Sequence, residues 1–108
     1  MATSFGEFIR QNRANNQMTL TQLAALLGID SANLSKIETG KRNFDEKKLE
    51  RLAIVFNVDL EELRIEYFSD LIAKKIYIIS NTKRTLNRAE EKVKQLKTTL
   101  SKTTKLHY

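Results

Sequence analysis

The sequence predicts an all-helical protein. Its 108 residues include no proline, no tryptophan and only three glycines, so the chain lacks the turn chemistry that hairpins and sandwiches need. Leu, Ala, Glu, Lys and Ile are abundant, and most of them favour helices. A hydrophobic content of 41% supports one core of modest size. We therefore expect five helices within about the first 80 residues, followed by a helical extension.

The first helix is expected to begin after Ser4, a typical N-cap residue that has Glu7 three positions later. Its apolar residues recur at the spacing of one helix face, which predicts that they are buried: Phe5, Phe8 and Ile9.

Two short helices are predicted next. Thr19 and Gln22 have the spacing of a capping box, so a helix begins at Leu20. Gly28 stands where this helix must end in a left-handed conformation, and Asp30 is the expected cap of the following helix. The side chains expected to face inward are Leu23, Ala24, Leu27, Leu34 and Ile37.

Two helices joined by a tight glycine turn form a motif that presents its second helix to the DNA major groove. The outward side chains of that helix are small, hydrogen-bonding or basic: Ser31, Ala32, Asn33, Ser35 and Lys36. A basic loop with Lys41 and Arg42 follows Gly40, where the helix is expected to end.

Two more helices complete the predicted domain. Asp45 is the expected cap of a fourth helix that ends at Asn57, and Asp59 pairs with Glu62 at the start of a longer one. We expect residues 1–66 to form the DNA-binding domain and residues 67–108 to form the extension.

Residues 5–63 resemble the helix-turn-helix domain of the Cro/C1-type, or XRE, family of bacterial and phage regulators. The motif that carries the resemblance comprises Leu23-Ala24, Gly28, Leu34-Ser35-Lys36-Ile37-Glu38 and Gly40-Lys41-Arg42-Asn43. The resemblance implies a structural salt bridge between Arg13 and Glu38. The chain departs from the family at Leu20, where a phosphate-binding glutamine is common, and at Phe44, where proline is common. Phe44 is expected to be a packing residue rather than a surface aromatic.

The resemblance also implies which residues contact DNA. Base contacts are expected from the start and middle of the third helix, at Ser31, Ala32, Asn33 and Lys36. Asparagine can form two hydrogen bonds with adenine, and lysine can donate to guanine O6 and N7. Contacts with the DNA backbone are expected from Thr19, Ser35, Lys41, Arg42 and Asn43. The alternative is a helix face that is merely solvated.

The positive charge of the chain lies outside this domain. The segment 1–63 contains eight basic and nine acidic residues, whereas the segment 64–108 contains eleven basic and four acidic residues. DNA binding by the first half must therefore depend on local cations and not on the formal net charge of +6.

The C-terminal half has a heptad pattern, with apolar residues every seven positions: Ile65, Ile72, Ile79, Leu86, Val93 and Leu100. Ser80-Asn81-Thr82 favours a helix cap, which predicts a break there. Antiparallel packing of the last segment is mildly preferred, because it brings Glu90 near Lys97 whereas parallel packing opposes Lys92 and Lys97. The alternative for residues 83–108 is a frayed, solvated helix.

The leading hypothesis is a homodimeric transcription regulator that binds an inverted repeat in double-stranded DNA, similar to restriction-modification controller proteins. The residues expected at the dimer interface are Leu60, Ile65, Phe68, Ile72, Ile76 and Ile79. The alternative is an antitoxin-like module whose C-terminal helices bind a partner protein.

Other classes of function are disfavoured. The chain has no set of residues typical of catalysis, no cysteine, and a single histidine, His107, so we expect neither an enzyme nor a cofactor or metal. No segment approaches the roughly 20 apolar residues that span a membrane, and the N-terminus lacks the apolar core of a signal peptide. We expect a cytoplasmic protein.

Overall fold

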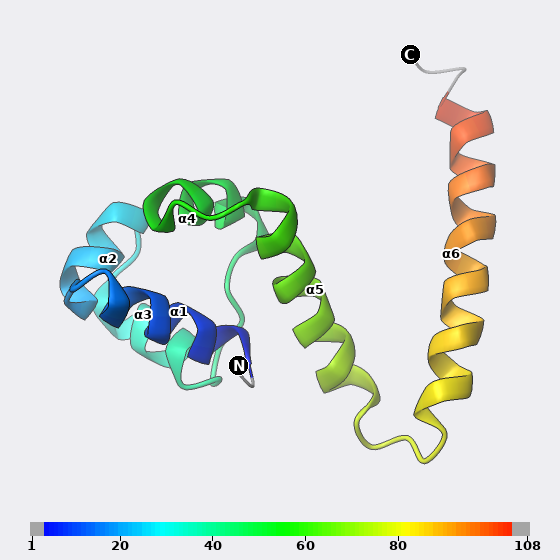
Figure 1. The fold of residues 1–108 in the computed structure, drawn as a ribbon, viewed down its shortest axis with the longest axis horizontal. Helices are drawn as coiled ribbons and strands as arrows, with labels where there is room; N and C mark the ends of the chain where they lie inside the picture. The colour runs from blue at the N-terminus through cyan, green and yellow to red at the C-terminus, as the bar shows by residue number, and fades with distance from the viewer. Residues whose placement is uncertain (1–3, 105–108) are drawn as a thin grey trace. The chain divides into compact units, whose positions relative to one another are not determined.

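A computed structural model describes residues 4–104, with side chains up to residue 100, and this part of the chain is all-helical, as predicted (Figure 1). His107 lies outside the described residues. The helices are α1 (Phe5–Asn15), α2 (Leu20–Leu27), α3 (Ser31–Glu38), a 3-10 turn η1 (Glu46–Lys48), α4 (Leu49–Phe56), α5 (Leu60–Ile76) and α6 (Thr82–Thr104).

The chain divides into two compact units, Met1–Ile72 and Ala73–Tyr108. The division therefore falls after Ile72 and within α5, beyond the boundary expected after residue 66. The physical reason is that the next turn of α5 still belongs to the core of the first unit, where Tyr67 is buried and Leu71 packs against the buried cluster.

Side-chain caps define the starts of the first three helices, as the sequence predicts. Ser4 Oγ accepts from the Glu7 N–H at 3.1 Å, and Thr19 and Gln22 form a reciprocal capping box. At the other end of α2, Gly28 has φ +70°, the left-handed conformation that ends a helix without steric cost. The turn between α2 and α3 is thus determined by local chemistry.

The expected start of the fourth helix is wrong. Asp45 caps η1 and not α4, because its carboxylate accepts from the Lys47 N–H at 3.0 Å while its carbonyl accepts from the Lys48 N–H at 2.9 Å. These bonds tighten the chain into a 3-10 turn. Consequently α4 begins at Leu49, which is buried.

One apolar cluster holds α1 to α5 together. Phe44 is part of it, 3% exposed, and its carbonyl accepts from the buried Tyr67 hydroxyl at 2.7 Å. Phe44 is therefore a packing residue, as expected. The fully enclosed side chains of the cluster are Ile9, Leu23, Leu27, Leu34, Leu49, Leu52 and Leu63.

The second unit contains α6, and the predicted helix break is confirmed. Helix α5 ends at Ile76 and α6 begins at Thr82. The side chain of Asn81, just before α6, accepts a hydrogen bond from the Arg84 N–H at 3.4 Å. The described apolar side chains of α6 are exposed at heptad spacing: Leu86, Val93, Leu96 and Leu100.

Candidate nucleic-acid interface

The inner face of α3 is fixed by packing, and this determines which side chains face outward. Leu34 and Ile37 are buried where α3 packs against α1 and α2. Among the residues expected to contact bases, Ala32 and Lys36 are exposed on the opposite side, whereas Ser31 and Asn33 are half-buried at the flanks of the inner face. Ser35 is also half-buried.

A buried ion pair ties the C-terminal end of α3 to α1. Arg13 Nε donates to Glu38 Oε2 at 2.8 Å and Arg13 Nη2 donates to Glu38 Oε1 at 3.0 Å. This is the salt bridge that the family resemblance implies, and the structure shows that it is bidentate. Hydrogen bonding to Glu38 raises the pKa of the Arg13 guanidinium. Arg13 Nη1 also donates to the Met18 carbonyl at 3.1 Å, so the same side chain holds the turn before α2.

The basic loop folds back along α3. Gly40 has φ +83°, and the N–H groups of Lys41 and Arg42 both donate to the Lys36 carbonyl, at 2.8 and 3.3 Å. Lys41, Arg42 and Asn43 are exposed. The expected phosphate-binding residues therefore lie next to the outward face of α3.

Arg42 makes a contact that the sequence analysis missed. Its Nη1 donates to Asn33 Oδ1 at 2.6 Å. A residue expected at the DNA backbone is thus brought against a residue expected to contact bases. No local pattern predicts this bond, because it depends on the path of the loop after Gly40.

Thr19 lies exposed at the start of α2, but its backbone N–H donates to the Gln22 side chain at 2.8 Å. Its hydroxyl oxygen accepts from the Gln22 N–H. The hydroxyl proton is therefore the group that Thr19 itself can offer to a phosphate.

The residues expected at the dimer interface occupy several environments. Ile65, Phe68 and Ile72 are exposed on α5, at i, i+3 and i+7 spacing that places them on one helix face. Leu60 packs against the core of its own chain. Ile76 ends α5 half-buried, and Ile79 is exposed in the segment before α6.

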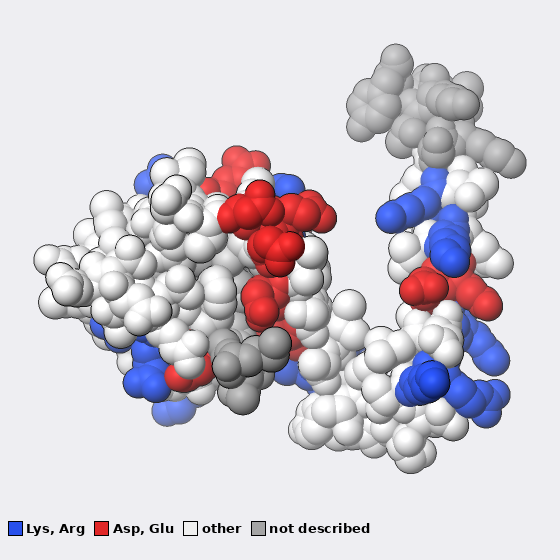
Figure 2. Space-filling view, in the orientation of Figure 1, with Lys and Arg blue, Asp and Glu red and all other residues white. Residues whose placement is uncertain are grey.

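Acidic and basic residues are unevenly distributed over the visible face of the first unit, although each kind also occurs among the other. Acidic atoms gather near the junction of α4 and α5 in the space-filling view, while basic atoms lie along the lower edge, on the side of α3 (Figure 2). The acidic residues at this junction include Glu50, Asp59, Glu61 and Glu62. The acidic group at this junction disfavours the approach of a polyanion such as DNA from that side.

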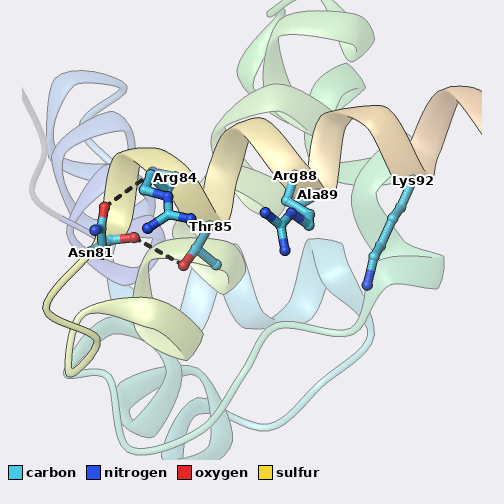
Figure 3. A pocket seen from close by; sticks show the side chains of 6 residues that line it. All are labelled: Asn81, Arg84, Thr85, Arg88, Ala89 and Lys92. Atoms are coloured by element: carbon cyan, nitrogen blue, oxygen red, sulfur yellow. Dashed lines mark hydrogen bonds between the residues drawn. The ribbon is translucent and has the colours of Figure 1, made fainter.

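On α6, a shallow depression is lined by basic and small polar side chains. Arg84, Arg88 and Lys92 project from it at i, i+4 and i+8 positions, beside Asn81, Thr85 and Ala89 (Figure 3). Like charges at this spacing repel one another within a helix, and here all three side chains are exposed to solvent.

Two further observations concern the described residues only. No helix among them is both long and apolar enough to cross a bilayer. Nor do they contain a group of three or more His, Cys, Asp or Glu side chains that could hold a metal ion.

The geometry of α2, the glycine turn and α3 defines a helix-turn-helix domain of the DNA-binding type. Residues 9–63 match the family model described as helix-turn-helix, and the chain belongs to this family, in its Cro/C1-type (XRE) branch.

Two proteins of Bacillus subtilis (strain 168) are similar in this region. The uncharacterized HTH-type transcriptional regulator RghRB is 42% identical over 60 residues, which are 55% of this chain and 43% of that protein. The HTH-type transcriptional repressor RghR is 36% identical over 61 residues, covering 56% of this chain and 45% of that protein. The matches thus span less than half the length of these two relatives.

The crystal structure of a transcriptional regulator from Listeria innocua covers 88% of this chain and 94% of its own, with a TM-score of 0.52 and 23% sequence identity. This is a likeness of fold.

Proposed function

We propose that the protein is a transcription regulator that binds double-stranded DNA sequence-specifically, as a homodimer on an inverted repeat. The observation that carries the proposal is the outward face of α3, where polar and basic side chains are held by a buried inner face and bordered by a basic loop. Such a helix fits the major groove, and the loop lies where phosphates would pass.

A dimer is proposed because one helix-turn-helix makes few base contacts. Two copies related by a two-fold axis contact half-sites about 34 Å apart, one turn of the DNA helix. The exposed apolar face of α5 formed by Ile65, Phe68 and Ile72 is the proposed contact between copies in the first unit. Apolar area of this kind is what a stable dimer buries.

Lys36→Ala is expected to reduce affinity for a selected DNA site about tenfold, because Lys36 is exposed in the middle of α3 and can donate to guanine. Asn33→Ala is expected to reduce discrimination at another base pair. Fluorescence-anisotropy titrations against the selected site and a scrambled duplex measure both effects. Arg64→Ala is the control, because it removes an exposed charge from α5, outside the motif. If neither α3 variant changes the ratio of specific to nonspecific affinity, α3 does not select the site.

Ile65→Asp is expected to convert the dimer to a monomer, because the carboxylate would be desolvated in an apolar contact. Size-exclusion chromatography with light scattering measures this mass. Ile54→Asp is the control, since Ile54 is also an exposed isoleucine but lies on α4 and not on the α5 face formed by Ile65, Phe68 and Ile72. Equal mass for the wild type and the Ile65 variant would contradict an α5-mediated dimer.

A second candidate function is a protein-interaction module. The observation that favours it is the exposed heptad pattern of α6, which has described apolar side chains at 86, 93, 96 and 100. In that case the purified chain is monomeric and α6 binds an apolar helix of another protein. The mass measurement above separates the two proposals. A role as a restriction-modification controller stays a prediction.

A further inference from the structure

The hydrogen bond between Arg42 and Asn33 fixes the orientation of the Asn33 amide. A guanidinium group has donors only, so the atom that faces Arg42 Nη1 at 2.6 Å must be the amide oxygen. The amide NH₂ of Asn33 is then directed away from the guanidinium. Hydrogen bonds from the backbone N–H groups also hold both residues: the Asn33 N–H donates to the Asp30 carboxylate, and the Arg42 N–H donates to the Lys36 carbonyl.

This orientation disfavours the asparagine–adenine contact that the sequence alone suggests. That contact requires the amide oxygen to accept from adenine N6 while the NH₂ donates to N7. Arg42 occupies one acceptor site of the oxygen and places a positive charge beside it, which repels the amino hydrogens of adenine. The groups that remain on Asn33 and Arg42 are almost all donors.

Guanine presents the complementary edge. Its major-groove side carries two acceptors, N7 and O6, and no donor. We propose that Asn33 and Arg42 act as one donor unit that contacts guanine, and that Arg42 is a specificity-determining residue and not only a phosphate contact. This inference rests on the proposed DNA-binding function.

The test uses the full-length chain and selection of bound duplexes from a random pool. The wild type is expected to enrich guanine at one position of each half-site. In the Arg42→Ala protein, the guanine preference at this position is expected to fall about tenfold. Adenine is expected to be enriched at the same position, because the amide oxygen of Asn33 becomes free to accept from it. Lys41→Ala is the matched control, since it removes an exposed cation from the adjacent position. It is expected to weaken binding to all sequences while the guanine preference is retained.

A second measurement changes the DNA and not the protein, and it is made on the wild type and on Arg42→Ala. Replacing the selected guanine with 7-deazaguanine removes one acceptor, and it is expected to weaken wild-type binding about tenfold. The same replacement is expected to have little effect on Arg42→Ala.

Two results would overturn the inference. One is an Arg42→Ala protein that keeps the guanine preference and binds all DNA sequences more weakly, as Lys41→Ala is expected to do. The other is a wild-type preference for adenine at the position that Asn33→Ala relaxes. Failure of the proposed function itself is distinguishable, because the wild type would then enrich no sequence at all. Thermal unfolding of each variant verifies that these exposed substitutions leave the fold intact.

Discussion

Arg13→Ala is expected to lower the free energy of unfolding by about 3 kcal/mol, because it leaves a buried charge unpaired. The Glu38 side chain is only 4% exposed and receives two hydrogen bonds from Arg13. Without them the carboxylate keeps its desolvation cost and loses its partner. Urea denaturation followed by circular dichroism measures the change.

Arg10→Ala provides a matched control on the same helix. Arg10 also pairs with a glutamate, Glu7, at 3.0 Å, but this pair is solvent-exposed and spans one helical turn. Exposed pairs are screened by water and contribute little, so no measurable change is expected. If the two variants unfold at the same urea concentration, the Arg13–Glu38 pair does not stabilise the scaffold.

The helices were predictable because their ends depend on bonds between residues close in sequence. The Thr19–Gln22 capping box joins residues three apart, and the left-handed turn at Gly28 needs only a residue without a Cβ atom. Apolar spacing then identified the buried faces of α2 and α3. These features are local, and packing with the rest of the domain agrees with them.

The features that the sequence did not predict depend on contacts between distant segments. The extent of the first unit is one example, because it follows from Tyr67, whose hydroxyl reaches the Phe44 carbonyl 23 positions earlier. The 3-10 turn is an exception, because its hydrogen bonds are local. It was not predicted because a capping aspartate at residue 45 is compatible with either kind of helix.

In the candidate site too, locally determined features were predictable and contacts across loops were not. The outward residues of α3 were predictable from helical periodicity, but the Arg42–Asn33 bond was not, since it joins residues nine positions apart across a loop. The Arg13–Glu38 pair spans 25 positions, and only the family resemblance suggested it. Side-chain pairing across loops therefore had to come from the structure.

Gly6→Ala is expected to destabilise the protein by about 2 kcal/mol, the cost of forcing a methyl group into a closed contact. The same change inside an ordinary helix stabilises by about 0.5–1 kcal/mol, so the expected sign is reversed. A Cβ atom at Gly6 would clash with the Ile37 carbonyl oxygen and would lie 2.8 Å from that of Glu38. Both are backbone atoms at the end of α3, so α1 and α3 would have to separate. Thermal unfolding measures the effect.

Gly40→Ala separates this steric cost from backbone strain. A Cβ atom there would meet nothing within 4 Å, but φ is +83°, so only the cost of a left-handed conformation, about 1 kcal/mol, is expected. A Gly6→Ala protein that melts at or above the wild-type temperature would show that α1 does not approach α3 so closely. Because Gly6 and Arg13 act on the same end of α3, their effects should not add. Once α1 has moved away, the Arg13–Glu38 pair is already weakened, and the double variant should lose less stability than the sum of the two single changes.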